Sequence, residues 1–162
     1  MSLSNIEKKI FNWNELTSQC LEWQAQGQKI VFTNGCFDIL HFGHLHYLAA
    51  AKALGDRLVI GMNAGSSVAK LKGAHRPIQD EKTRLFMIAS LQYVDAVTIF
   101  EEDTPLNLIK TIRPNILVKG GDWPIESIVG AEFVLATGGE VKSLTFIDGY
   151  STTAIETKIK NS

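Results

Sequence analysis

Five short strand-like runs alternate along this chain with segments of helical periodicity, and this alternation constrains the fold more than any other feature. The predicted strands occupy residues 29–33, 57–62, 96–100, 115–119 and 140–144. The interval between the first two is long enough for a helical crossover, which allows the strands to run parallel. The pattern therefore predicts an α/β fold: a single Rossmann-like domain with a doubly wound, mainly parallel five-stranded sheet and helices on both faces.

Helix start and stop signals fill the intervals between the strands. The predicted helices run from 44 to 54 before Gly55, from 81 to 91 after an Asp80 cap, from Thr104-Pro105 with proline at the first helical position, over 126–136, and onward from a Ser151 cap. Ahead of the first strand, Asn14 can cap a helix that Gly27 ends. We therefore expect an N-terminal helical extension, residues 1–28, packed on a domain that spans residues 29–162.

Composition excludes several classes of protein. The 162 residues include 45% hydrophobic ones and carry a formal net charge of −1, so disorder is excluded and no basic excess favours nucleic acid. There is no apolar run long enough to span a membrane and no signal-peptide pattern. Cys20 and Cys36 lack the CxxC spacing of a disulfide or zinc framework. We expect a cytoplasmic protein that binds neither nucleic acid nor membrane.

The loop after the first strand carries two histidines at the start of a helix. His41 and His44 are three residues apart, so both rings can lie on one face beside unpaired backbone N–H groups, while Gly35 and Gly43 allow a ligand to approach the backbone. This arrangement suits a phosphate group. The alternatives are a simple cap, a buried structural histidine, or a zinc site that includes His46; the spacing argues against zinc, which favours i, i+4 pairs with a nearby Glu.

The loop after the fourth strand contains a glycine pair. Lys119 can reach a phosphate, and Gly120 and Gly121 allow a ligand to approach the backbone closely. Asp122 can accept hydrogen bonds from ribose hydroxyls, and Trp123 can pack against a base. A plain turn with a solvated lysine is the alternative.

Two further clusters carry hydroxyl and basic side chains. Gly149 and Tyr150 precede Ser151, Thr152 and Thr153, which could bind phosphate at a helix N-terminus or merely cap it. In a strand-like stretch Lys70 and Lys72 would point to the same side, near Arg76 and ahead of Arg84. A solvated loop is the alternative there. The chain has no GxxxxGK[ST], GxGxxG or GxSxG motif, which argues against P-loop enzymes, common dehydrogenases and serine hydrolases.

Two of these motifs resemble a known family. His41-Phe42-Gly43-His44 and Gly149-Tyr150-Ser151-Thr152-Thr153 are similar to the HxGH and G-x-S-T-T signatures of cytidylyltransferase-like nucleotidyltransferases, and the resemblance covers residues 29–159. Four further stretches resemble the D-glycero-β-D-manno-heptose 1-phosphate adenylyltransferase branch, which in many bacteria is the C-terminal domain of a bifunctional heptose kinase/adenylyltransferase. These stretches are 34–41, 71–77, 100–105 and 117–122.

The resemblance implies transfer of AMP from ATP to the anomeric phosphate of a heptose, giving ADP-heptose and pyrophosphate for the lipopolysaccharide inner core. The implied catalytic residues are His41, His44 and Lys72. The implied nucleotide contacts are Thr33, Asn34, Phe37, Gly43, Lys119, Gly120, Gly121, Asp122, Ser151, Thr152 and Thr153. Asp38, Arg76 and Arg84 are candidate substrate contacts. The resemblance also implies a homodimer, and the charge of the substrates implies Mg²⁺ held by ATP phosphates and water, without a dedicated protein metal site.

Two positions depart from the family patterns. Phe146 stands where glycerol 3-phosphate cytidylyltransferases carry an arginine, which favours the heptose branch. Asn63-Ala64-Gly65 stands where that branch often has Asn-Ser-Asp, so a contact near the sugar is in question. The alternatives are a cytidylyltransferase acting on an alcohol phosphate such as glycerol 3-phosphate, and a nucleotide-binding module without catalysis.

Overall fold

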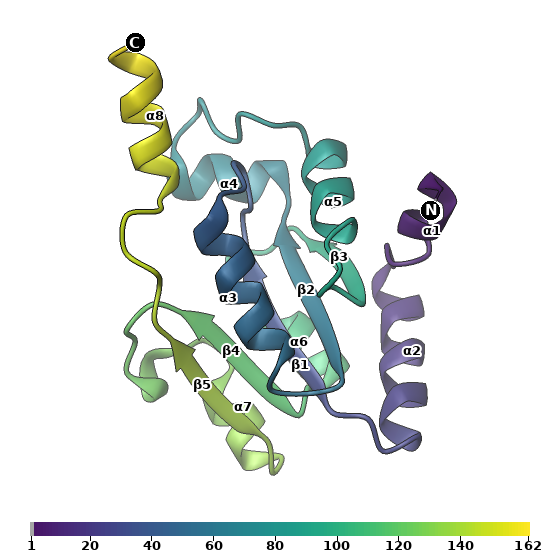
Figure 1. Cartoon of the computed structure of the whole chain (residues 1–162). Coiled ribbons are helices and arrows are strands. Elements are labelled where there is room, and N and C mark those ends of the chain that lie inside the picture. The colour runs from purple at the N-terminus through teal and green to yellow at the C-terminus, as the bar shows by residue number, and fades with distance from the viewer. Residues whose placement is uncertain (1) are drawn as a thin grey trace.

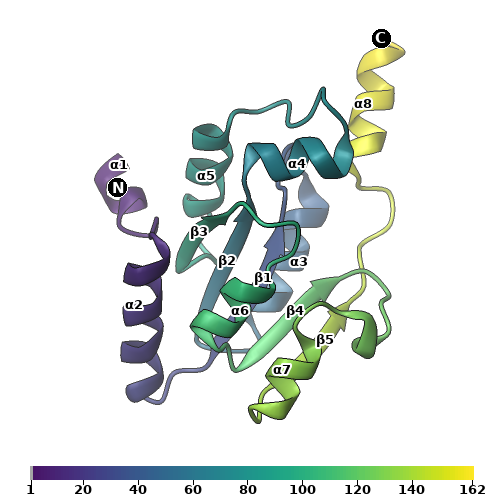
Figure 2. The same cartoon turned by 180° about the vertical axis from the view of Figure 1, so that it is seen from behind.

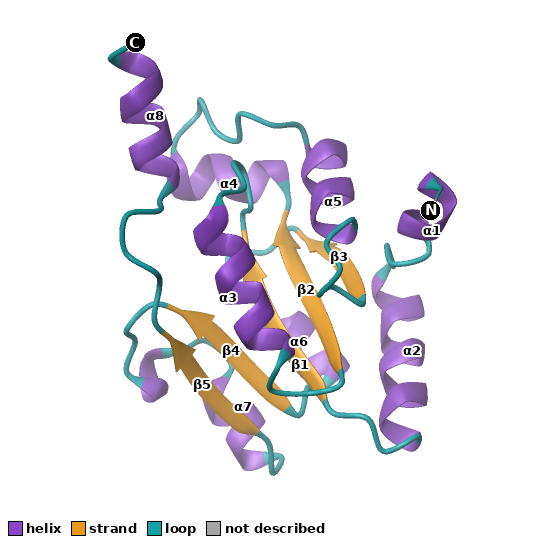
Figure 3. Cartoon of the chain, viewed as in Figure 1, coloured by secondary structure: helices purple, strands orange, loops and turns teal. Residues whose placement is uncertain are grey.

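The computed structural model, which describes residues 2–162, contains one five-stranded sheet in which all neighbouring strands are parallel (Figure 3). The sheet order is β3-β2-β1-β4-β5. The strands are β1 (Ile30–Gly35), β2 (Arg57–Asn63), β3 (Ala96–Phe100), β4 (Ile116–Gly120) and β5 (Glu140–Leu144). The predicted doubly wound α/β fold is confirmed, and each predicted strand lies within two residues of its observed bounds.

Helices cover both faces of this sheet. They are α1 (Leu3–Glu7), α2 (Trp13–Ala25), α3 (Phe42–Lys52), α4 (Gly65–Lys72), α5 (Glu81–Ala89), α6 (Leu106–Ile112), the 3₁₀ helix η1 (Ile125–Ser127), α7 (Ala131–Ala136) and α8 (Thr152–Lys160). Helices α3 and α5 pack on one face, while α2, α6 and α7 pack on the other (Figures 1 and 2). None of the helices within residues 2–162 is long and apolar enough to cross a membrane.

The core is divided by the sheet into two clusters, as alternation along β1 shows. Ile30 and Phe32 point toward α2 and α6, whereas Val31 points toward α3. All three side chains are fully buried, because β1 is central and has helices on both faces. Consequently the strand reads in the sequence as a continuous apolar run.

The first long helix begins two residues earlier than its predicted cap. Asn12, rather than Asn14, is the N-cap of α2: its Oδ1 accepts from the Glu15 backbone N–H at 3.0 Å, and the Glu15 carboxylate accepts from the Asn12 N–H at 3.1 Å. This reciprocal capping box satisfies two backbone donors at once. Gly27, with a φ of +76°, follows the helix end as predicted, and Trp23 is buried in the core.

The strand-like interpretation of residues 70–72 is wrong. These residues form the end of α4, which Gly73 closes with a φ of +103°. Because residues two apart do not face each other on a helix, Lys70 and Lys72 point to different sides. The Lys70 ammonium lies 3.5 Å from the Asp103 carboxylate at the surface.

The single helix predicted over 126–136 is instead broken into two pieces. Gly130 separates η1 from α7 and adopts a φ of +89°. A Cβ at this position would lie 2.7 Å from Ile109 of α6, so glycine is required both for the turn and for packing.

The strand order creates a crevice between β1 and β4. From β1 the chain winds outward to β2 and β3, then returns to the other side of β1 to form β4 and β5. The loops that follow β1 and β4 therefore diverge, and ligands of doubly wound sheets bind at this point. Both glycine-containing loops singled out in the sequence follow these two strands.

Candidate active site

The histidine pair lies where β1 leads into α3. His41 is the N-cap residue of α3 and His44 lies in its first turn, and their ring centroids are 4.0 Å apart. The Nδ1 atoms of both rings are buried and have no hydrogen-bond partner among residues 2–162. Buried polar atoms are normally satisfied, so this pair is left ready for a ligand that can bond to both.

Glycine between the histidines is required by the packing. A Cβ at Gly43 would lie 3.0 Å from His41 Nδ1 and 3.2 Å from the Cβ of Tyr150. The Tyr150 ring in turn contacts Phe42, with centroids 5.2 Å apart. The two signature motifs, more than a hundred residues apart in sequence, therefore lie side by side at the start of α3.

Burial keeps the histidines neutral in the free protein. It lowers the pKa of His44 to about 4, with smaller contributions from the nearby charges of His41 and Lys72. Burial also lowers the pKa of His41. A bound anion would raise both pKa values, because negative charge favours the imidazolium. The pair can therefore act as neutral donors or, on binding phosphate, gain positive charge.

A metal cage built from protein side chains does not fit the residues present. Within residues 2–162 no group of three or more His, Cys, Asp or Glu side chains lies close enough to hold a metal ion. His46, the third member of the zinc alternative, is exposed and its ring faces Phe42.

A buried tyrosine connects the strands on either side of the crevice. The Tyr47 hydroxyl lies 2.5 Å from the Thr33 hydroxyl on β1 and donates to the Val118 carbonyl of β4 at 3.4 Å. Burial raises the pKa of Tyr47 to about 12, so the phenol stays protonated. Sequence reasoning did not identify Tyr47, although its position three residues after His44 places it on the same side of α3.

The turn after β4 is shaped by aromatic side chains. A Cβ at Gly120 would lie 2.6 Å from the Phe146 ring, and Gly121 adopts a φ of +111°. The Trp123 indole donates to the Gly120 carbonyl at 3.0 Å. Lys119 is half-buried, and this burial lowers its pKa, while Asp122 is exposed.

The Asp38 carboxylate is hydrogen-bonded to other parts of the chain. Its carboxylate accepts from Arg76 at 2.6 Å and from the backbone N–H groups of Ile78 and Gln79, each at 2.9 Å. Burial alone would raise the pKa of Asp38, but these hydrogen bonds outweigh burial and hold it below its ordinary value. Arg76 also contacts the Glu156 carboxylate of α8. Asp38 and Arg76 thus join the loop after β1 to the loop before α5 and to α8.

Arg84 is buried beside the ends of β1 and β2, and within residues 2–162 its Nε and Nη2 atoms have no hydrogen-bond partner. This fully buried side chain donates from Nη1 to the carbonyls of Cys36 at 2.8 Å and Asn63 at 2.9 Å. It therefore braces the ends of β1 and β2. Next to Cys36, Phe37 adopts a φ of +47° and covers Gly35, where a Cβ would lie 2.9 Å from the ring.

The remaining predicted site residues lie around this edge of the sheet. Ser151 is the N-cap of α8 and accepts from the Ala154 N–H at 3.0 Å, so part of its predicted role is structural. Thr152 and Thr153 form the first turn of α8, which projects from the body and has no buried residue (Figure 1).

Lys72 is exposed at the end of α4 and acts on His44 electrostatically. Asn34 lies at the end of β1.

Comparison with known families agrees with these motifs. The model of the cytidylyltransferase-like family matches residues 32–157. The proteins named bifunctional protein HldE from Campylobacter fetus and Nitrobacter hamburgensis are 53% and 52% identical, over 97% and 92% of this chain. That from Marinomonas sp. is 55% identical over 87% of the chain. These alignments cover 32%, 30% and 30% of the relatives, so the chain spans about a third of their length.

Two solved structures share the fold. The lipopolysaccharide core biosynthesis protein from Thermoplasma volcanium matches with a TM-score of 0.60 and 33% identity, over 77% of this chain and all of that one. Pantoate-beta-alanine ligase from Francisella tularensis matches with a TM-score of 0.56 over 93% of this chain and 76% of that one, and at 15% identity it supports the fold alone. Motifs, strand order and family match agree, and the chain belongs to the cytidylyltransferase-like family of nucleotidyltransferases.

Proposed function

We propose that this protein transfers AMP from ATP to D-glycero-β-D-manno-heptose 1-phosphate, forming ADP-heptose and pyrophosphate, as a step toward the lipopolysaccharide inner core. The observation that carries nucleotidyl transfer is the His41–His44 pair, whose buried Nδ1 atoms have no partner at the β1–α3 junction. The choice of heptose is supported by about 50% identity to HldE proteins over most of the chain.

The chemistry needs positioning and charge stabilisation more than a protein nucleophile. An oxygen of the sugar phosphate attacks the α-phosphorus of ATP, a new P–O bond forms, and the bond to the β,γ-pyrophosphate breaks on the opposite side. Negative charge gathers on the leaving pyrophosphate, and preorganised donors that match it lower the barrier. His41 and His44 supply such donors, and the positive end of α3 adds to them.

The other roles follow from position. Lys72 would neutralise charge on the reacting phosphates, since it already acts electrostatically on His44. Thr33, Asn34, Phe37 and Gly43 would line the phosphate cradle. The nucleoside and the outer phosphates would contact the remaining residues, which are Lys119, Gly120, Gly121, Asp122, Ser151, Thr152 and Thr153.

Asp38, Arg76 and Arg84 would act indirectly, by holding the loops through the contacts described above. Mg²⁺ would bind through the ATP phosphates and water and would supply further charge neutralisation. Following the family resemblance, we also propose a cytoplasmic homodimer.

The test is pyrophosphate release in the presence of Mg²⁺, with ATP or CTP paired with heptose 1-phosphate or glycerol 3-phosphate. Turnover only with ATP and the heptose phosphate is the expected result. Turnover with CTP and glycerol 3-phosphate would place the protein in the cytidylyl branch. No turnover in any mixture would contradict the proposal and favour another sugar phosphate or a module without catalysis.

A further inference from the structure

Helix α8 begins with the hydroxyl residues of the second signature motif but is attached to the body by few contacts. None of its nine residues, all of which the structure describes, is buried, so apolar packing does not fix its position. Figures 1 and 2 show the helix standing clear of the sheet, with its start near the end of α4. Specific contacts are therefore needed if Ser151, Thr152 and Thr153 are to meet a phosphate in a fixed arrangement.

Two contacts hold the first turn of α8, one on each side of it. Before the helix, the Tyr150 ring packs on Phe42 of α3, with centroids 5.2 Å apart. Within the helix, the Glu156 carboxylate forms an ion pair with Nη2 of Arg76. Among residues 2–162, this pair is the only ion pair or side-chain hydrogen bond between α8 and the rest of the chain. The three hydroxyl residues lie between these two points of attachment.

Arg76 connects α8 to the histidine loop through separate nitrogens. Its Nη1 donates to the Asp38 carboxylate at 2.6 Å, while its Nη2 faces Glu156. Asp38 lies three residues before His41 in the loop after β1. The planar fork of a guanidinium can hold two carboxylates at once. The side chains of Arg76, Asp38 and Glu156 are only 15%, 1% and 25% exposed, so salt screens this network less than a surface ion pair.

The pattern of exposure along α8 shows which hydroxyl this ion pair turns toward the body. Thr152, Ile155 and Glu156 are half-buried, whereas Thr153 and the other residues of the helix are exposed. Because residues three and four apart share one face of a helix, Thr152 lies on the same face as Glu156. The contact with Arg76 therefore fixes the rotation of α8 and presents Thr152, rather than Thr153, toward the body.

We propose that Glu156 is a positioning residue for nucleotide binding, whose ion pair with Arg76 orients α8 so that Thr152 meets the outer phosphates of ATP. This proposal rests on the proposed function, because it concerns a substrate of that reaction. The competing interpretation is that Glu156 occupies Arg76 only until a substrate phosphate displaces it. The charge of Asp38 beside Arg76 opposes the binding of a phosphate there, which favours the positioning role.

The test measures nucleotide binding separately from turnover. Calorimetry with the full chain and Mg²⁺ compares a non-hydrolysable ATP analogue with AMP, which lacks the outer phosphates. Glu156→Ala and Thr152→Val should each weaken binding of the ATP analogue by about tenfold and leave the affinity for AMP unchanged. Combining the two substitutions should add little, because Glu156 acts through Thr152. Lys158→Gln removes an exposed charge from the same helix and should change neither affinity.

Several results would overturn the positioning role. Tighter binding of the ATP analogue by Glu156→Ala would show that Glu156 blocks Arg76 instead. Equal losses for AMP and the ATP analogue would indicate a general structural defect, and an unchanged affinity for both, or a wild type that binds neither, would leave no positioning role for Glu156. Binding of the ATP analogue that depends on Glu156 without formation of ADP-heptose would support the positioning role while contradicting the proposed reaction, so the two failures are distinguishable.

Discussion

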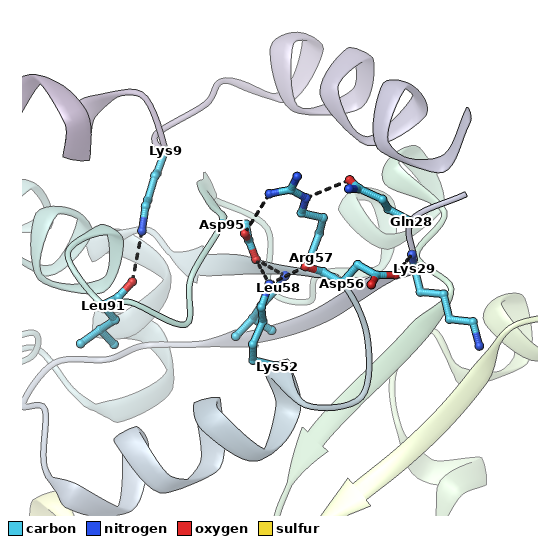
Figure 4. Close-up of polar contacts among 9 residues, drawn as sticks. All are labelled: Lys9, Gln28, Lys29, Lys52, Asp56, Arg57, Leu58, Leu91 and Asp95. Carbon is cyan, nitrogen blue, oxygen red and sulfur yellow. Dashed lines mark hydrogen bonds and ion pairs between the residues drawn. The ribbon is translucent and has the colours of Figure 1, made fainter. Parts of the chain in front are cut away.

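The two ends of this parallel sheet treat their charged groups in opposite ways. At the amino edge, Asp95 accepts from Lys52 at 2.6 Å, from Arg57 at 3.2 Å and from the Leu58 backbone N–H at 2.7 Å (Figure 4). Arg57 also donates to the Gln28 side chain at 2.9 Å. Every oxygen of this carboxylate is in use, and the network joins β2 to α3 and to the turn before β3.

At the carboxyl edge, Asp38 is hydrogen-bonded as fully as Asp95, but the histidine pair is not. Within residues 2–162 the buried Nδ1 atoms of His41 and His44 have no hydrogen-bond partner. Leaving such groups unsatisfied destabilises the free protein, and a ligand can recover that free energy. The charged network at the amino edge stabilises the fold, whereas the unpaired histidines at the carboxyl edge are available for binding. Substitutions at the two edges should therefore separate stability from activity.

The largest effect is expected from His41→Ala. Loss of a donor to the departing pyrophosphate should lower kcat/KM by at least about two orders of magnitude, or about 3 kcal/mol of transition-state stabilisation. Steady-state pyrophosphate release measures this, with His46→Ala as a control from the exposed side of the same helix. The unfolding midpoint in urea should not fall. Unchanged turnover would show that His41 is not catalytic.

Asp95→Ala should lower stability and leave activity unchanged, the reverse of His41→Ala. Removing a carboxylate with three partners should lower the free energy of unfolding by about 2 kcal/mol, since hydrogen bonds to charged groups are among the stronger ones. Urea denaturation measures this change, and kcat/KM should stay at the wild-type value. Glu140→Ala breaks an exposed ion pair with Lys142 and should change stability by less than about 1 kcal/mol. Equal destabilisation by both variants would contradict the special role of the amino edge.

The inner strands β1, β2 and β4 were predictable because each contains a compact apolar run that is buried on both faces, whereas the edge strand β5 has no buried residue. Helix α4 was not predicted as a helix, because its sequence GSSVAKLK buries only Ser67 and Val68 and shows no apolar stripe. The Asn14 cap was wrong for a reason that the sequence contained: Glu15 stands three residues after Asn12, the capping-box spacing.

Within the site, local spacing predicted the histidine pair, but contacts between distant segments could not be predicted from the sequence. Tyr47 meets Val118 across 71 positions, and Asp38 meets Gln79 across 41. Such contacts depend on strand order and register, which no single segment encodes. The sequence therefore identified candidate phosphate-binding residues and also Asp38, Arg76 and Arg84. It did not predict the contacts that these three make, and it missed Tyr47.

Tyr47→Phe should produce a smaller effect, on both stability and nucleotide binding. The variant leaves the Thr33 hydroxyl without its partner beside the crevice, so we expect a loss of about 1 kcal/mol in stability. If Tyr47 positions Thr33 for the nucleotide, KM for ATP should rise several-fold with KM for the sugar phosphate unchanged. Thr33→Val should reproduce that KM change, and combining the two substitutions should add little. Equal changes in both KM values would indicate a general structural defect instead.

A last prediction concerns the pH dependence of stability contributed by His44. Its pKa is about 4 in the folded protein, below the ordinary 6.5 expected for the unfolded chain. Between these values the unfolded state binds a proton that the folded state excludes, so this contribution to stability is complete above pH 6.5 and is lost as the pH falls toward 4. His44→Gln lacks this titration, and its Tm should fall less than that of the wild type between pH 7 and pH 4.5. His46→Gln, an exposed neighbour, should keep the wild-type dependence, and identical Tm changes in all three proteins would show that His44 is not held neutral by burial.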